Sequence, residues 1–361
     1  MLSITSFKAN ISAGIRLADV SDTRDNNYNL LRFLAAAGVI VSHSYPLSHG
    51  AGTHEPLSDI LGFSLGRLSV YIFFVVSGFL IAKSFCQCKG MLDYTLARVF
   101  RIFPALIAIV LLSALVLGPI VSELPANTYF SDISVYTYII RNISLVSLQF
   151  GITGVFEDNI YPSAINGSLW TLPYEIACYI MIACIGFVGA FRSKSILFLV
   201  LFAYGLAWLF HEFISFDHAL WYKLGLFLEL SLYFWAGSLS YIYRDRIALN
   251  LPLVIVFLLL SLVFIDTDFF KFAFAPGLTL AIFYLVYIPA GLVREYNKLG
   301  DYSYGLYIIA FPTQQVLSMM IQDISPLEMM LYTFFITLFF SVISWHILEK
   351  PALRLRRYFI K

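Results

Sequence analysis

Hydrophobic residues gather along this chain in windows of about 20 positions, separated by short polar segments. Ten windows can be recognised, at approximately residues 28–46, 65–85, 103–122, 168–190, 195–213, 221–243, 250–265, 272–292, 302–321 and 328–348. An apolar stretch of about 20 residues is long enough to cross the hydrocarbon core of a bilayer as an α-helix. The pattern therefore predicts an all-α, polytopic membrane protein with about ten transmembrane helices.

The composition agrees with lipid as the main solvent of this protein. Of the 361 residues, 60% are hydrophobic and only 12% are charged, whereas roughly 25% are charged in a soluble domain. The formal net charge is +1, so the chain as a whole does not attract nucleic acid, and we predict no such partner. The four cysteines are spaced neither as a disulfide framework nor as a metal site.

Lysine and arginine residues predict how the windows are oriented. With a cytoplasmic N-terminus, 18 of the 23 Lys and Arg residues fall on the cytoplasmic side and only four on the outer side, as the positive-inside rule requires. Both termini are then cytoplasmic. We predict a cytoplasmic lead-in at residues 1–27, a single transmembrane domain at 28–350 and a basic cytoplasmic tail at 351–361.

An outer stretch, residues 123–167, lies between two of the windows. Its segment 133–150 is half apolar and is interrupted by Arg141 and Asn142, which predicts an amphipathic helix at the interface or a cover over a cavity. Aromatic residues of this stretch could stack on sugar rings, although aromatic residues also collect at any membrane interface. They are Tyr129, Tyr136, Tyr138 and Tyr161.

The first window contains two residues that are costly in hydrocarbon, Arg32 and His43. A separation of 11 residues is three helical turns plus about 20°, so both side chains leave one helix face, roughly 16 Å apart along the axis. Ionisable residues within a membrane are functional candidates by default. The alternative is that Arg32 reaches lipid headgroups and His43 bonds a neighbouring carbonyl.

Two further pairs of residues are candidates for chemistry. Arg98 and Arg101 are three positions apart, so on a helix they would project from one side and could bind a polyanion together. They are equally compatible with a simple topology signal. Trp170 and Glu175 lie at the outer end of the fourth window, where Glu175 could orient His43, receive a proton, or form a structural hydrogen bond with a tyrosine.

Six stretches follow one another along residues 26–357. They are "NNYNLLRFLAAAGVIVSHSYPL", "VYIFFVVSGFLIAKSF", "ARVFRIFPALI", "GSLWTLPYEI", "LGDYSYGLYIIAFPTQQ" and "SWHILEKPALRLRR". In this order, with R-x10-H in the first and R-x-x-R in the third, the chain resembles the acyltransferase-3 family of integral membrane acyltransferases. Members of this family modify bacterial surface polysaccharides.

The resemblance implies a multi-pass O-acetyltransferase of the bacterial inner (cytoplasmic) membrane. It implies acetyl-CoA as a cytoplasmic co-substrate, no permanently bound cofactor and no metal. The implied acceptor is a glycan or glycolipid at the outer face, and polysaccharide-synthesis proteins are possible partners. The implied site residues are His43 and Glu175 for catalysis, Arg32, Arg98 and Arg101 for acyl-CoA binding, and Trp170 and Tyr304 for acceptor binding or structural support.

The chain departs from the family pattern at two positions. Many members have Asp where this chain has Asn29, and many have His where it has Ala310. His43 is thus the one strong candidate for a general base or a transient acyl carrier. Its ordinary pKa, about 6.5, suits proton transfer near neutral pH.

A proton-coupled secondary transporter of a small anionic or sugar substrate is the alternative function. Ten spans, prolines within them and an intramembrane histidine also suit such a carrier. However, residues 28–190 and 195–348 show no clear inverted repeat, and a carrier has no need of the R-x-x-R stretch.

Overall fold

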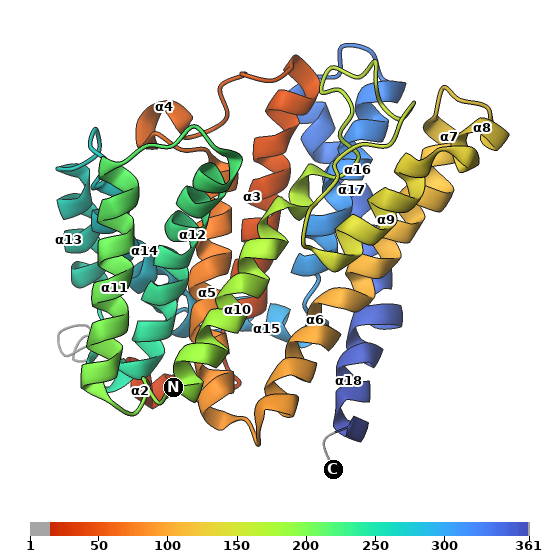
Figure 1. Cartoon of the computed structure of the whole chain (residues 1–361). Coiled ribbons are helices and arrows are strands. Elements are labelled where there is room, and N and C mark those ends of the chain that lie inside the picture. The colour runs from red at the N-terminus through yellow and green to blue at the C-terminus, as the bar shows by residue number, and fades with distance from the viewer. Residues whose placement is uncertain (1–14, 360–361) are drawn as a thin grey trace. The chain divides into compact units, whose positions relative to one another are not determined.

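The computed structural model of the protein describes residues 15–359 (Figure 1). The start of the predicted lead-in, residues 1–14, and the end of the predicted tail, residues 360–361, lie outside the described residues. The described chain is mostly helical, with one pair of very short antiparallel strands, β1 (Ile15–Arg16) and β2 (Ala248–Leu249). The predicted helical class is confirmed.

Each of the ten predicted windows is occupied by a helix. These helices are α3 (Tyr28–His49), α5 (Leu65–Gln87), α6 (Met91–Leu112), α10 (Leu172–Phe187), α11 (Lys194–Phe213), α12 (Ala219–Ile242), α13 (Leu251–Leu262), α14 (Phe270–Tyr287), α16 (Ser303–Met320) and α17 (Pro326–Ser344). Two of them continue through π-helical segments, α6 through η1 (Ser113–Leu117) into α7 (Gly118–Val121), and α17 through η4 (Trp345–Glu349) into α18 (Lys350–Phe359). The shorter elements are α2 (Leu17–Ser21), α4 (Ser58–Leu61), α8 (Ala126–Ser131), α9 (Ile133–Ser144), η2 (Gly167–Thr171), η3 (Arg244–Arg246) and α15 (Leu292–Leu299).

Within the described chain, seven helical stretches are long and apolar enough to cross a membrane. They are Tyr28–His49, Leu65–Gln87, Met91–Val121, Gly167–Phe187, Lys194–Phe213, Phe270–Tyr287 and Pro326–Arg356. The helices of the other three windows are not both long and apolar enough, for two physical reasons. Helices α12 and α16 are long enough but more polar. Helix α13 has 12 residues and is therefore about 18 Å long, whereas the hydrocarbon core is about 30 Å thick.

Apolar side chains cover whole faces of several of these helices. In α11, Leu197 is buried, whereas Phe198, Phe202 and Phe213 are exposed. In α17, Leu331, Phe335 and Phe339 are exposed in the same way. Such large apolar faces are costly in water and are stable against lipid tails. The chain is therefore a multi-pass membrane protein.

The chain divides into two compact units, each built from three segments. The first unit comprises the described residues up to Leu31, Tyr71–Lys89 and Tyr174–Glu295. The second comprises Arg32–Val70, Gly90–Pro173 and the chain from Tyr296 to its end. Most of the predicted site residues lie in the second unit, and Glu175 lies in the first.

Small residues let the helices of the first unit approach closely. A Cβ atom on Gly78 of α5 would collide with the carbonyl oxygen of Phe234, and one on Gly237 of α12 would collide with that of Val75. Ser238 donates a hydrogen bond to the Gly78 carbonyl at 3.0 Å. Close backbone contact of this kind is a main source of helix association in membranes.

In the second unit, α16 packs along α17, and α18 packs along α6 (Figure 1). The outer stretch between α7 and η2 contains the helix α9, which has 12 residues and is too short to span a bilayer. Val135, Tyr138 and Asn142 of α9 are buried, whereas Ile133 and Ile140 are exposed. An amphipathic helix is therefore present over Ile133–Ser144, the first part of the predicted segment 133–150, and its place at the membrane interface or over a cavity stays a prediction.

Candidate active site

Helix α3 carries Arg32 and His43, the two residues of the first window that are costly in hydrocarbon. It runs without interruption from Tyr28 to His49, so the expected spacing holds, and Arg32 and His43 lie on one helix face. Both side chains are partly exposed. The structure therefore supports the geometry predicted for this pair, with the arginine near the start of the helix and the histidine about three turns further on.

Arg32 and Arg101 meet at one buried carboxylate, that of Asp301 in the loop before α16. Arg32 donates from Nη1 to Oδ2 of Asp301, and Arg101 donates from Nη2 to the same oxygen at 2.7 Å. Arg101 also donates from Nη1 to Oε2 of Glu349 at 3.3 Å, and Glu349 is only 1% exposed. Two guanidinium groups and two carboxylates thus form a network without excess charge.

The charge of Asp301 is held by its neighbours. Burial would by itself raise the pKa of Asp301, but Arg101, Arg32 and hydrogen bonds from Ser303 outweigh it, so that the pKa lies below its ordinary value. Asp301 is therefore ionised at neutral pH, as both arginines need. Since carboxylates bond to the guanidinium groups, Arg32 and Arg101 are held in defined orientations.

The ring of Tyr304 packs against the guanidinium of Arg101 in this network. The guanidinium of Arg101 is 5.7 Å from the centre of the Tyr304 ring and 6.0 Å from that of Trp345. The Tyr304 hydroxyl donates to the carbonyl of Ile102 at 3.0 Å. These contacts favour structural support of Arg101, one of the two roles that the resemblance implies for Tyr304.

Arg98 lies on α6, one turn before Arg101. Because α6 begins at Met91, both arginines are helical and project from one side, as their spacing predicts. The guanidinium of Arg98 lies over the ring of Tyr94 at 5.6 Å. Whether Arg98 and Arg101 bind acyl-CoA together stays a prediction.

The imidazole of His43 presents one nitrogen and buries the other. Its ring meets the ring of Phe311 edge-on, with the centroids 5.4 Å apart. Nδ1 is buried and has no hydrogen-bond partner among the described residues. Nε2 is not among the fully buried atoms, and no described residue bonds to it, so it is the more accessible of the two ring nitrogens.

The segment around Trp170 is fixed against α16. Asn166 donates to the carbonyl of Ile308 at 2.8 Å, and Tyr307 donates to the carbonyl of Ser168 at 2.8 Å. Trp170 itself is partly exposed, with the guanidinium of Arg67 5.1 Å from the centre of its ring. The segment that carries Trp170 is therefore a built part of the second unit.

Glu175 lies on α10 in the first unit. Ser77 donates to Oε1 of Glu175 at 3.0 Å, and Tyr179 donates to the same oxygen. The structural alternative for Glu175, a hydrogen bond with a tyrosine, is thus present in the structure. Its predicted role beside His43 stays a prediction.

The four tyrosines of the outer stretch separate into two groups. Tyr129 and Tyr138 are buried, so neither offers a ring face to a sugar, and the Tyr129 hydroxyl donates to the carbonyl of Ala114 at 2.7 Å. Tyr136 and Tyr161 form the other group. Tyr136 is 45% exposed, and its hydroxyl donates to the carbonyl of Phe130 at 2.9 Å. Tyr161 is partly exposed and lies edge-on to Phe311 at 6.0 Å. Since Phe311 also touches His43, Tyr161 is the tyrosine with a connection to the candidate base.

Asp301 and Glu349 are site residues that sequence reasoning missed. Both lie in stretches that carry the family resemblance, "LGDYSYGLY" and "SWHILEKP". Each is separated from Arg101 by 200 or more residues, so neither helical periodicity nor local spacing could pair them. The sequence signal that could have pointed to them is that both side chains are carboxylates beside an apolar window, where a carboxylate needs a cationic partner.

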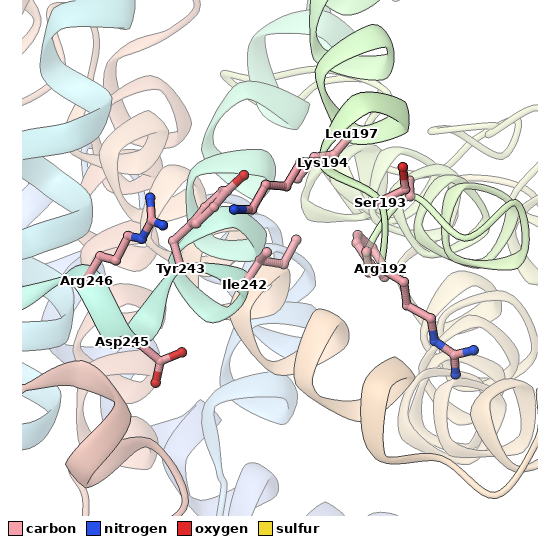
Figure 2. Close-up of a pocket in the computed structure, with 10 residues that line it drawn as sticks. Arg192, Ser193, Lys194, Leu197, Ile242, Tyr243, Asp245 and Arg246 are labelled. Atoms are coloured by element: carbon pink, nitrogen blue, oxygen red, sulfur yellow. The ribbon is translucent and has the colours of Figure 1, made fainter.

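A pocket of about 260 Å³ lies in the first unit, between residues 190–194 and the segment from Ile242 to Arg246 (Figure 2). Lys194 reaches toward Tyr243, whereas the Arg192 guanidinium points away from them. None of the predicted site residues lines this pocket. Its cationic side chains diverge, so they do not form one site for an anion.

Sequence comparisons relate this chain to known acyltransferases. A family model described as an acyltransferase domain matches residues 25–348. The O-acetyl transferase of Shigella phage Sf6 is 29% identical over 348 residues, covering 91% of this chain and 96% of the relative. Nodulation protein 10 of Rhizobium leguminosarum bv. viciae is 26% identical over 363 residues, covering 92% and 94%. No solved structure matches the chain significantly.

Proposed function

Because the chain belongs to the acyltransferase-3 family of integral membrane acyltransferases, we propose that it transfers an acetyl group from acetyl-CoA to a sugar hydroxyl. The proposed acceptor is a cell-surface polysaccharide or its lipid-linked precursor. The proposed location is the bacterial inner membrane. The observation that carries the proposal is His43, whose more accessible ring nitrogen, Nε2, lies within a membrane-length helix. The name of the Sf6 relative, an O-acetyl transferase, supports acetyl as the transferred group.

The proposed topology has ten spans with both termini in the cytoplasm. In this orientation Arg32, Arg98 and Arg101 lie toward the cytoplasmic end, and His43 lies in the outer half of the membrane. The pantetheine arm of coenzyme A is on the order of 15–20 Å long, similar to the axial offset of roughly 16 Å between Arg32 and His43. The arginines would bind the phosphates of the donor while its thioester reaches His43.

The proposed chemistry is acyl transfer with His43 as general base. Nε2 of His43 takes the proton of the sugar hydroxyl as its oxygen attacks the thioester carbonyl. The carbon–sulfur bond then breaks, the acetyl group stays on the sugar as an ester, and the departing thiolate receives the proton from His43. If His43 instead carries the acetyl group, Nε2 attacks the thioester carbonyl, the carbon–sulfur bond breaks to give an acetyl-imidazole, and the imidazole proton passes to the departing thiolate. The sugar hydroxyl then attacks the acetyl carbonyl, the carbon–nitrogen bond breaks, and the hydroxyl proton passes to the imidazole.

The proposed acceptor side is the surface near Phe311. Tyr161, which lies against Phe311, is partly exposed and could stack on a sugar ring. Trp170 is a second aromatic candidate, although its contact with Arg67 equally suits structural support. A protein that delivers or polymerises the glycan is a possible partner.

The test uses acetyl-CoA labelled in its acetyl group. Membranes with wild-type protein or with the His43→Ala variant are incubated with the donor and with total host glycolipid and polysaccharide. We expect base-labile label in a glycan fraction with the wild type. A positioned base contributes about 10²–10⁴-fold in rate, so the His43→Ala variant should lose nearly all transfer.

His49→Ala is the matched control, because His49 is an exposed histidine at the end of the same helix. It should keep wild-type transfer. Substantial transfer by purified, folded His43→Ala protein would overturn the proposed role of His43. An absence of labelled product from folded wild-type protein, with every host glycan fraction supplied, would count against acetyl-CoA or glycan as the substrate.

A further inference from the structure

Two buried polar atoms without a hydrogen-bond partner lie on facing helices of the second unit. They are Nδ1 of His43 on α3 and Oε1 of Gln314 on α16, both without a partner among the described residues. A buried donor or acceptor without a partner destabilises the folded protein. Two of them on facing helices therefore call for an explanation.

The hydrogen bonds of Gln314 fix which way its amide points. Its side chain is fully buried, and Nε2 donates to the carbonyl of Ile40 at 3.0 Å and to Oγ of Ser44 at 2.9 Å. A carbonyl oxygen only accepts, so the nitrogen, not the oxygen, must face Ile40. Oε1 of Gln314 is therefore an acceptor that is free to bind an N–H group.

The same contacts place Gln314 at the part of α3 that carries His43. Ile40 is three residues before His43 and Ser44 one residue after it, all within one helical turn. On α16, Phe311 lies three residues before Gln314, on the same face. Phe311 touches the imidazole ring, so two successive positions of this face of α16 contact α3 around His43.

We propose that Gln314 is a positioning residue for His43, whose Oε1 accepts the N–H of Nδ1 in the reacting enzyme. This inference rests on the proposed function. Catalytic hydrogen bonds are often long before substrate binds and shorten in the complex. With the proton of the neutral imidazole held on Nδ1, the lone pair lies on Nε2, the more accessible of the two ring nitrogens.

An amide suits this position chemically. Nε2 gains the hydroxyl proton during the attack, and both nitrogens of the resulting imidazolium are then donors. Oε1 of Gln314 keeps the Nδ1 proton in place while Nε2 passes its proton on to the departing thiolate. Because an amide does not itself take up a proton at neutral pH, Gln314 fixes the tautomer without competing as a base.

The test compares three variants of the full-length protein in lipid nanodiscs. Gln314→Leu removes the acceptor, Gln314→Glu keeps an oxygen acceptor, and Ser44→Ala removes only a partner of Nε2. We expect kcat to fall about 10²-fold in Gln314→Leu, no more than the loss of a base, with an unchanged KM for acetyl-CoA. Ser44→Ala should stay within about tenfold of the wild-type kcat. Gln314→Glu loses the N–H groups that face Ile40 and Ser44 and can itself take up a proton, so its kcat should also fall, but its remaining oxygen should keep the His43 proton on Nδ1.

Nitrogen-15 chemical shifts of His43 provide a readout that a structural role would not move. The wild type should carry its proton on Nδ1, and Gln314→Leu should show a mixture of tautomers. If the wild-type proton is on Nε2, or if Ser44→Ala loses as much kcat as Gln314→Leu, Gln314 only joins two helices and the inference is wrong. The wild-type spectrum decides even if Gln314→Leu does not fold.

The failure of this inference is distinct from that of the proposed function. If His43→Ala retains acetyl transfer, the base itself is misassigned and the proposed function falls. If His43→Ala is inactive while Gln314→Leu keeps the wild-type kcat, only the role of Gln314 is overturned.

Discussion

At the residue scale, the charged side chains of the second unit divide the work of binding and support. Asp301 and Glu349 hold Arg32 and Arg101 in place. Among the described residues, His43 makes no ion pair, and its ring is packed by Phe311. The proposed roles in donor binding and proton transfer therefore fall on separate side chains, whose variants should have different kinetic effects.

Arg98→Ala should weaken donor binding with little effect on chemistry. A hydrogen bond to a charged group contributes about 1.5–3 kcal/mol, so KM for acetyl-CoA should rise by roughly 10- to 100-fold while kcat changes little. Initial rates over a range of acetyl-CoA concentrations measure this. Arg192→Ala is the control, since it removes the same charge from an exposed loop of the first unit. An equal rise in KM in both variants would show that Arg98 does not bind the donor and contributes only to membrane topology.

Asp301→Asn should destabilise the protein in a pH-dependent manner. Removing one partner of a buried ion pair costs about 3–5 kcal/mol. Because the pKa of Asp301 is lowered by folding, its contribution is complete above the ordinary aspartate pKa and is lost as the pH falls through the lower, folded value. Thermal unfolding should therefore separate wild type and variant fully at pH 7 and progressively less below about pH 4.

The control for this charge is Asp323→Asn, because Asp323 is exposed in the turn between α16 and α17. It should unfold like the wild type at every pH. A difference between wild type and Asp301→Asn that does not change with pH would show that the ionisation of Asp301 does not determine its hold on the two arginines.

At the element scale, hydrophobic periodicity predicted each long helix but not what joins the helices. The window at 103–122 begins twelve residues after the true start of α6, because the amphipathic turns that carry Arg98 and Arg101 are not continuously apolar. The short helix α15 and the β1–β2 pair were not predicted, since both are too short to show a period. His43 and Arg32 could be found from their cost in hydrocarbon, whereas Gln314 could not, because a neutral amide in an apolar window has no such signal.

The close contact between α5 and α12 in the first unit leads to a prediction about helix packing. Gly78→Ala should destabilise the protein by about 1–3 kcal/mol, because the added methyl group meets the backbone carbonyl of Phe234, which cannot move aside as a side chain would. Thermal unfolding in detergent measures the loss. Gly205→Ala on α11 is the control, since a Cβ there meets nothing, and helix propensity should make it neutral or more stable by about 0.5–1 kcal/mol. Equal stability of the two variants would mean that α5 and α12 do not pack at these glycines.

At the scale of the whole molecule, the number of spans depends on α13. Helices α12 and α16 are long enough to cross, and polar residues in them have partners within the protein. Glu229 of α12 forms an ion pair with Lys271 of α14, and Gln314 of α16 donates hydrogen bonds to α3. Helix α13 has only 12 residues. Helix α13 crosses the membrane if the turns that follow it, up to Phe269, complete the span. A short apolar segment can in addition be accommodated by local thinning of the bilayer.

Cysteine accessibility decides between a crossing and a re-entrant α13. In a background whose native cysteines are replaced by serine, Asp268→Cys lies after α13 and Asp245→Cys lies before it, and both positions are exposed. If α13 crosses, a membrane-impermeant thiol reagent should label Asp268→Cys on intact cells and Asp245→Cys only after permeabilisation. Labelling of both positions only after permeabilisation would make α13 re-entrant, and every later span would then reverse. The basic segment after Lys350 would move to the outer side, against the positive-inside rule, and the proposed placement of Asp301 beside a cytoplasmic donor would fall with it.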